Sequence, residues 1–200
     1  PHAKALDPIK ADPERFGDEA NWQKGETVED GLRGRVLAMI DLLRSLGDIG
    51  HDPGLIAPAL ARLDAVYGKV LADPAAARDA LTLAVQAMLA AFPDGGMATV
   101  AAKGPRETLE KNHALFTRVA RAPDLLDRDW GIWQSLRGLF TSNRSSKTPE
   151  GYDDLAAAII QAADALPTHP GPLKDAKLHL CCLIACAQEV MAAYEARKKA

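Results

Sequence analysis

The C-terminal stretch of the chain, LKDAKLHLCCLIACAQEVMAAYEAR at residues 173–197, is the segment that decides the fold class. At about 100° per residue, its polar side chains Lys174, Lys177, Gln188 and Glu195 gather on one narrow face, and nearly everything else is apolar. A helix that is apolar around most of its circumference lies at the centre of a bundle or in an interface. The pattern therefore predicts a long, largely buried C-terminal helix, and deletion of residues 173–200 should give an insoluble or molten product.

The composition of the 200-residue chain favours helix over sheet. Alanine supplies 37 residues and leucine 25, whereas valine and isoleucine together supply only 16. Alanine and leucine lose little conformational freedom in a helix, while β-branched residues lose χ1 freedom. With 48% hydrophobic and 26% charged residues, the chain belongs among ordered globular proteins, which excludes collagen-like, disulfide-scaffold and wholly disordered classes.

Proline, glycine and capping residues divide the rest of the chain into helical segments. Asp73-Pro74 is typical of a helix start, Gly47 of an end, and Pro93-Asp94-Gly95-Gly96 of a break. Apolar residues recur between these points at helical spacing, and no strand pattern is found in the sequence. We expect an all-α, antiparallel helical bundle of about seven helices, over residues 27–46, 53–71, 74–92, 105–121, 123–140, 149–166 and 173–197.

The predicted domain organisation is an extended or partly helical N-terminal arm at residues 1–26, followed by a single all-helical domain at residues 27–200. The arm is rich in charge, proline and glycine, and only Phe16 and Trp22 are large apolar anchors. We therefore expect removal of residues 1–12 to change the melting temperature little.

The net charge and the cysteine content limit which partners and which cellular compartment the sequence predicts. The formal net charge is -3, so the chain as a whole lacks the dense cationic surface that non-specific nucleic-acid binding needs. No secretory signal is visible, and no charge-free apolar window of about 18 residues predicts a membrane span. Three cysteines, two of them adjacent at Cys181 and Cys182, indicate reduced thiols in a cytoplasm rather than a disulfide framework.

One face of the terminal helix carries candidate ligands for a metal or a haem. Asp175, His179, Cys182, Cys186 and Glu189 follow one another at spacings of four, three, four and three, so their side chains point the same way. Imidazole and thiolate are good ligands for zinc, copper and haem iron. The alternative is structural, because buried cysteines behave as small hydrophobes and a lone histidine can be satisfied by one carbonyl.

Two further groups place a histidine near a carboxylate. Glu110-x-x-His113 matches one part of the di-iron motif of ferritin-like bundles, but the chain has no second Glu-x-x-His pair. Since His113 falls on the inward stripe of its helix, a buried histidine with a partner is the alternative. In Gly50-His51-Asp52-Pro53, the aspartate is predicted to cap the following helix rather than to bind a metal.

The stretch NHALFTRVARAPDLLDRDWGIWQSLRGLF, residues 112–140, resembles the helix–proline–helix entry of the alkylhydroperoxidase and carboxymuconolactone decarboxylase family. The peroxidase members of that family would imply a Cys-x-x-Cys pair with a nearby histidine and glutamate. Here the thiols are spaced as Cys182-x-x-x-Cys186, so no functional residue is carried over.

The segment from Trp130 to Lys147 is the predicted contact surface for a protein partner. Trp130 and Trp133 share a helical face, and tryptophan is enriched at binding hot spots as well as in cores. Arg137, Arg144 and Lys147 flank the aromatic residues with positive charge, which suits an acidic partner.

No catalytic constellation is complete, so the sequence favours a non-enzymatic soluble helical protein that acts through protein–protein contact, as a regulator, adaptor or accessory subunit. No cofactor is predicted under this hypothesis. The alternative is a bundle that binds a small molecule, metal or haem in an internal cavity, including a thiol/His redox enzyme of the alkylhydroperoxidase-like type. Its candidate ligands are Glu110 and His113 together with the face of the terminal helix.

Overall fold

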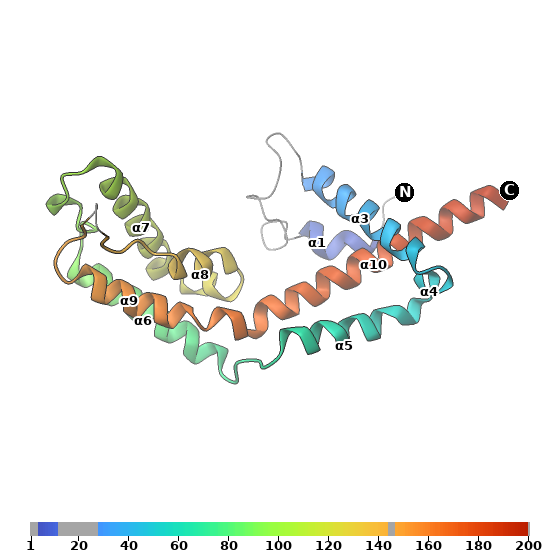
Figure 1. Cartoon of the computed structure of the whole chain (residues 1–200), viewed down its shortest axis with the longest axis horizontal. Helices are drawn as coiled ribbons and strands as arrows, with labels where there is room; N and C mark the ends of the chain where they lie inside the picture. The colour runs from blue at the N-terminus through green and yellow to red at the C-terminus, as the bar shows by residue number, and fades with distance from the viewer. Residues whose placement is uncertain (1–3, 12–27, 144–146, 200) are drawn as a thin grey trace. The chain divides into compact units, whose positions relative to one another are not determined.

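The computed structural model describes residues 4–11, 28–143 and 147–199, and these residues form helices and turns without any strand. The predicted all-α class is therefore confirmed for this part of the chain. Figure 1 shows the order of the helices, from α1 near the N-terminus to α10 at the C-terminus.

The chain divides into two compact units, and the single domain expected over residues 27–200 stays a prediction. Unit 1 combines Pro1–Gly68 with Pro172–Ala200, and unit 2 is the intervening Lys69–Gly171. The two ends of the sequence thus contribute to the same unit, a pairing that helical periodicity cannot reveal.

Unit 2 is built from four main helices that pack on one another. The helix α6 packs against both α7 and α9, and α8 packs against α9; α6 and α9 run side by side in Figure 1. The helices are α6 (Pro74–Ala91), α7 (Lys103–Arg121), α8 (Trp130–Arg137) and α9 (Tyr152–Ala163), with the 3-10 turns η4 (Met97–Thr99), η5 (Pro123–Asp127) and η6 (Leu166–Thr168) between them.

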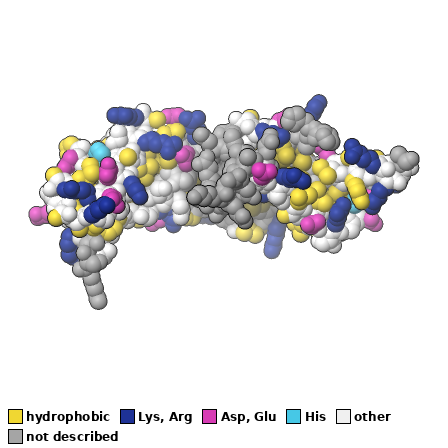
Figure 2. All heavy atoms as spheres, turned by 90° about the horizontal axis from the view of Figure 1, so that it is seen from above, with side chains coloured by type: hydrophobic (Ala, Val, Ile, Leu, Met, Phe, Trp, Pro, Cys, Tyr) yellow, Lys and Arg dark blue, Asp and Glu magenta, His cyan; other side chains and the backbone are white. Residues whose placement is uncertain are grey.

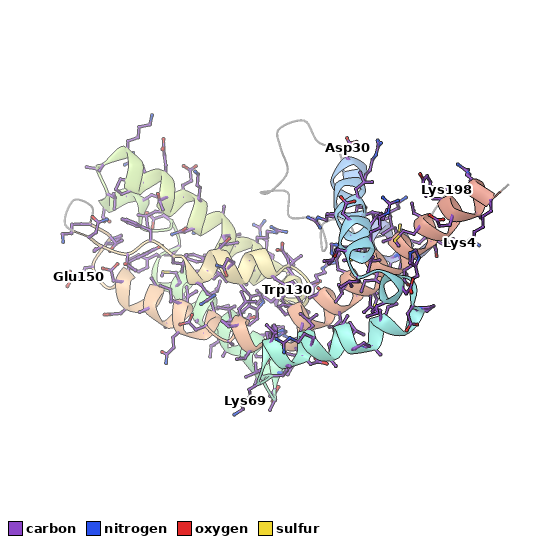
Figure 3. All side chains as sticks on the ribbon, turned by 45° about the vertical axis from the view of Figure 1, so that its right-hand side comes forward. Lys4, Asp30, Lys69, Trp130, Glu150 and Lys198 are labelled. Carbon is purple, nitrogen blue, oxygen red and sulfur yellow. The ribbon has the colours of Figure 1, made fainter. Side chains whose placement is uncertain are left out.

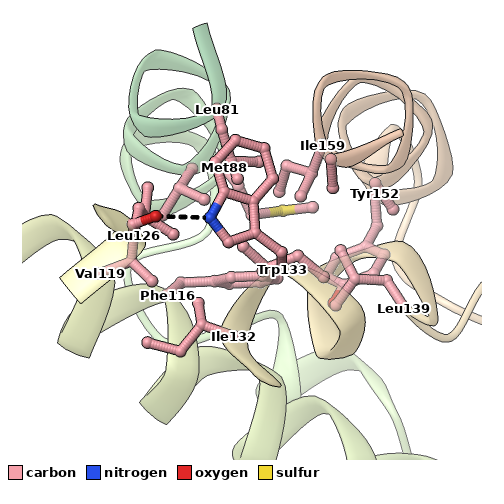
Figure 4. Close-up of a cluster of buried hydrophobic side chains, with 14 of the residues drawn as sticks. Leu81, Met88, Phe116, Val119, Leu126, Ile132, Trp133, Leu139, Tyr152 and Ile159 are labelled. Carbon is pink, nitrogen blue, oxygen red and sulfur yellow. Dashed lines mark hydrogen bonds between the residues drawn. The ribbon is translucent and has the colours of Figure 1, made fainter. Parts of the chain in front are cut away.

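The core of unit 2 draws apolar side chains from all four helices (Figure 4). Their spacing of three or four residues on each helix places them on one face, as the periodicity predicts. Burial of each large side chain contributes about 1.5–3 kcal/mol. Those with less than 2% exposure include Leu81, Val85 and Met88 of α6, Leu109 of α7, Trp133 and Leu136 of α8, and Tyr152 and Ile159 of α9.

Two helices of unit 2 begin at residues whose side chains cap the first turn. The carboxylate of Asp73 accepts the Ala76 N–H at 2.9 Å, directly before Pro74, as the sequence indicates. The predicted continuous helix over residues 123–140 is wrong, because Asp129 caps a new helix by accepting the Ile132 N–H at 3.3 Å. This segment is therefore divided into η5 and α8.

Unit 1 is built around the long C-terminal helix, with the N-terminal helices packed on it. Its apolar core joins Leu6 and Ile9 of the N-terminal residues, Leu32, Val36, Ile40 and Leu43 of α3, and Cys182, Leu183, Cys186, Ala187 and Met191 of α10. The elements are η1 (Lys4–Leu6), α1 (Asp7–Ala11), α3 (Val28–Ser45), α4 (Asp48–His51), η3 (Pro53–Leu55), α5 (Ile56–Tyr67) and α10 (Pro170–Lys199), of which the first two residues of α10 belong to unit 2.

The prediction that the C-terminal helix is largely buried is wrong. Buried side chains occupy eight of the 30 positions of α10, and Leu178, Val190 and Tyr194 are exposed. The helix is long and apolar, but the other helices of unit 1 cover only part of its circumference.

One helical stretch in the described part of the chain, within Tyr152–Lys199, is long and apolar enough to cross a membrane by length and composition alone, with a mean hydropathy of 1.4. The expectation from the sequence is that no such stretch exists. The core helix of a soluble protein meets the same criterion, so the finding by itself assigns no location.

The expectation that residues 1–12 matter little for stability is also corrected by the packing in unit 1. Leu6 is 8% exposed and Ile9 is 1% exposed, and both belong to the core shared with α3 and α10. Residues 4–11 are therefore a structural part of unit 1, whereas residues 12–26 of the predicted arm lie outside the described residues.

We predict that Ile9→Ala lowers the free energy of unfolding of unit 1 by about 2 kcal/mol, because it removes a buried side chain and leaves a cavity. The measurement is chemical denaturation followed by circular dichroism. The matched control is Asp7→Ala in the same short helix, where the side chain is exposed. Equal effects of the two substitutions would show that α1 does not contribute to the core.

Candidate functional site

Trp133 is a core residue, so its predicted place on a partner-binding surface is wrong. Its side chain is 0% exposed, and its indole Nε1–H donates to the carbonyl oxygen of Leu126 at 2.8 Å (Figure 4). A buried indole needs an acceptor for its one N–H. The hydrogen bond satisfies this requirement and fixes the ring within the core of unit 2.

Trp130 packs against the start of α10. Its ring centroid lies 5.0 Å from that of His169, and the His169 ring lies 5.4 Å from Trp133. A Cβ at Gly171 would overlap the end of the Trp130 ring, so glycine is required for this close approach. Trp130, labelled in Figure 3, is half-buried and packs against the core of unit 2.

Of the three cations of the predicted contact segment, Arg137 and Lys147 are described by the structure. The Arg137 Nε–H donates to a carboxylate oxygen of Asp164 at 2.9 Å, and Lys147 is exposed. Arg144 lies outside the described residues. The structure therefore gives no support to a continuous aromatic and basic surface from Trp130 to Lys147.

The sequence analysis did not identify His169, which has the smallest exposed fraction among the histidines that the structure describes. Its side chain is 4% exposed, and its Nδ1 accepts the Gly171 N–H at 3.0 Å. Burial lowers the pKa of His169, and the carboxylate of Asp127 opposes that shift. A signal was present: His169 directly precedes Pro170, the first residue of α10, whereas the predicted helix began only at Leu173.

Glu110 and His113 are not brought together in a ligand site. Glu110 is exposed, while His113 is half-buried with its imidazole against the backbone of Gly95, which adopts φ 71°. The buried Nδ1 of His113 has no hydrogen-bond partner in the structure. The inward position of His113 follows the predicted stripe, and its side chain lies against the turn that carries Asp94 rather than beside Glu110.

The candidate ligands on α10 do not share one environment. Cys182 and Cys186 pack in its apolar core, and burial raises the pKa of both thiols. Asp175 is buried, Glu189 is exposed, and His179 is half-buried, with its pKa lowered by burial and then by the nearby Arg35. Among the residues that the structure describes, no three His, Cys, Asp or Glu side chains are placed to hold a metal ion.

Reactive cysteines require a stabilised thiolate, which a lowered thiol pKa provides. The raised pKa values of Cys182 and Cys186 therefore argue against the thiol redox activity in the alternative hypothesis.

Asp52 has the predicted capping role. Its carboxylate accepts the Gly54 N–H at 2.8 Å at the start of η3.

Unit 2 also has an open surface depression of about 490 Å³ between α6 and η5. Arg78 on its wall is bound by Asp79 and Asp127, each at 2.9 Å, so the guanidinium is already neutralised. The remaining lining is Thr82, Leu83, Gln86, Pro123 and Asp124. This lining offers no set of convergent groups for catalysis or for a charged ligand.

No protein-family model, curated protein or solved structure matches this chain. Its function is therefore inferred from its own residues and their arrangement.

We predict that Trp133 fluorescence is shielded from iodide while Trp130 fluorescence is more accessible. The Trp22→Phe/Trp130→Phe variant isolates the buried indole, and Trp22→Phe/Trp133→Phe isolates the half-buried one. Because Trp133 has no exposed surface, its Stern–Volmer constant should approach that of a fully buried indole. Equal quenching of the two variants, with folding verified by circular dichroism, would contradict the core assignment.

We also predict that Cys181 reacts with iodoacetamide in the folded protein faster than either Cys182 or Cys186. Cys181 is half-buried, whereas the other two thiols are buried and have raised pKa values. Peptide mass spectrometry after timed labelling gives the three rates, and the denatured protein supplies the reference. If Cys182 or Cys186 were labelled as fast as in the denatured protein, the prediction would be contradicted, and these thiols would again be candidates for redox chemistry.

Proposed function

We propose that this protein is a non-enzymatic regulator, adaptor or accessory subunit that acts by binding another protein through unit 1. The surface in question comprises the apolar stripe of α5 and the exposed apolar side chains of α3, α4 and α10. This proposal keeps the predicted protein–protein contact, but it places the contact surface on unit 1 instead of on the segment from Trp130 to Lys147.

The observation that supports the proposal is that α5 has no buried residue. Its apolar side chains Ile56, Leu60, Leu63 and Tyr67 recur at spacings of four, three and four, and all four are only half-buried. A helix of 12 residues is marginal in isolation and is normally stabilised by packing of such a stripe. Partial cover of α5 therefore favours a partner that completes it.

The other helices of unit 1 add to the exposed apolar surface. Figure 2 shows hydrophobic side chains among cationic ones on the part of the surface formed by unit 1. Large contiguous apolar areas on soluble proteins commonly mark interaction sites. Among the residues that the structure describes, the exposed large apolar side chains of unit 2 are Val70 and Leu83, whereas those of unit 1 are Leu37, Leu42, Leu46, Ile49, Val66, Leu178, Val190 and Tyr194.

The charges beside these side chains indicate what kind of partner fits. Tyr194 lies between Arg44, 5.8 Å from its ring centroid, and Lys198, 4.4 Å from it. Arg62 is an exposed cation on α5. An amphipathic helix with carboxylates beside its apolar residues would complement this surface in both respects.

The ligand hypothesis has no comparable support in the described residues. Its candidate side chains divide between the units, with Glu110 and His113 in unit 2 and the α10 face in unit 1. The cytoplasmic location likewise stays a prediction, which rests on the three cysteines and on their being free thiols.

The proposal is tested by photo-crosslinking in cells with a benzophenone amino acid placed at Val66. Leu83 is the matched control position, because it is an equally apolar side chain of similar exposure, 68% against 71%, in unit 2. We expect an adduct with another protein from Val66 and not from Leu83. Peptide mapping of the adduct should identify an apolar helix that carries acidic residues.

A second variant, Leu60→Ser/Leu63→Ser, should remove the Val66 adduct, and circular dichroism of this variant must first show that its helical content is retained. No adduct, or the same adduct from both positions, would overturn the proposal. An adduct of twice the mass of the chain would show that the surface binds a second copy rather than another protein, and would also overturn it.

A further inference from the structure

The first turn of α10 is capped by an imidazole, not by the usual hydroxyl, amide or carboxylate. His169 directly precedes Pro170, and its Nδ1 accepts the Gly171 N–H at 3.0 Å. The first N–H groups of a helix have no partner within the helix, and an acceptor before the helix satisfies one of them. Pro170 has no N–H, so Gly171 carries the first amide that needs an acceptor.

The cap is held in position by the two tryptophans of α8. The His169 ring lies 5.0 Å from that of Trp130 and 5.4 Å from that of Trp133, and only 4% of the residue is exposed. Trp133 is itself fixed by its hydrogen bond to Leu126. The imidazole therefore occupies a defined position rather than an adaptable surface position.

We propose that His169 is a proton-sensitive cap, which closes the first turn of α10 while its imidazole is neutral and releases that turn when the imidazole is protonated. The proposal adds a conformational device to unit 2 and does not depend on the proposed binding surface of unit 1.

The two protonation states differ at the atom that makes the cap. Nδ1 can accept the Gly171 N–H only when it carries no proton, so the proton of the neutral ring is on Nε2. Protonation converts Nδ1 into a donor that faces another donor. It also places a positive charge at the positive end of the helix dipole.

The surroundings determine the pH range of the device. Burial against the indole rings lowers the pKa of His169, and the carboxylate of Asp127, on η5, raises it by a smaller amount. The pKa in the folded protein is therefore below that of an unfolded histidine, about 6.5. As the pH falls below that value, the unfolded chain takes up the proton first, so the stability from the cap is present above about pH 6.5 and is lost below it.

The place of the cap gives its release a structural consequence. The chain passes from unit 2 to unit 1 between Gly171 and Pro172. The turn that His169 closes is therefore next to one of the two places where the chain passes between the units, and protonation would loosen the start of α10 there.

The test is a pH titration of the full chain by ¹⁵N NMR, from about pH 8 to about pH 4.5, which spans the range of histidine. The imidazole nitrogens of His169 report the tautomer and the pKa, and the Gly171 amide reports the cap. We expect Nδ1 to be the unprotonated nitrogen at high pH and both signals to titrate with one midpoint below about 6.5. Hydrogen exchange of the Gly171 amide, relative to its intrinsic rate, should become roughly fivefold faster when the cap is lost.

Two variants separate the cap from other titrations. His169→Asn retains a capping acceptor but no titratable ring, so the Gly171 amide should no longer follow the pH. His113→Gln removes a histidine elsewhere in unit 2 and should leave the response intact. A Gly171 amide that ignores His169 titration, a midpoint at or above that of a free histidine, or a persistent response in His169→Asn would overturn the proposal. If His169→Asn does not fold, the titration of the parent protein still decides the matter.

Discussion

The interior of unit 2 depends on where the buried indole of Trp133 finds an acceptor for its N–H. The Leu126 carbonyl supplies it at 2.8 Å, and η5 and α8 are separate elements rather than one continuous helix. The carboxylate of Asp129 makes the break possible, because it caps the first turn of α8. The same start of α8 places Trp130 beside His169. One polar atom on a large apolar side chain thus constrains the turn, the helix start and the neighbouring aromatic contact.

The parts of the fold that were predictable from the sequence are those that depend on local interactions. The start at Pro74 and the end of α7 at Arg121 agree with the predicted boundaries, because capping and proline act within a few residues. The break before Trp130 was not predicted, although Asp129 was visible in the sequence. The apolar spacing continues across the break, and periodicity alone does not distinguish one helix from two successive helices that face the same core.

The candidate sites were harder to predict because residue type does not determine what covers a side chain. Trp133 and Cys186 are typical both of cores and of functional surfaces, and in the structure both are buried. The terminal helix is apolar around most of its circumference, so its sequence could not indicate which face would be covered. Its actual cover depends on residues such as Ile9, which is far away in the sequence and was assigned to an arm. His169 was missed because the helix start was placed three residues too late.

The two units use their apolar residues differently, and the proposed function rests on this difference. In unit 2, apolar side chains from four helices reach one closed core, and Trp133 is completely covered. In unit 1 the core is made mainly by α3 and α10 with the short α1, while α5 contributes no buried residue. Burial of apolar surface is the main favourable contribution to folding. A helix whose apolar side chains are only half-buried therefore contributes less to the stability of its unit than it would if they were fully buried. Leu60 and Leu63 are half-buried, so unit 1 covers only part of their apolar surface. A partner that covers the rest would add to this burial, and for this reason we propose the interaction surface on α5 and its neighbours rather than at the tryptophans of unit 2.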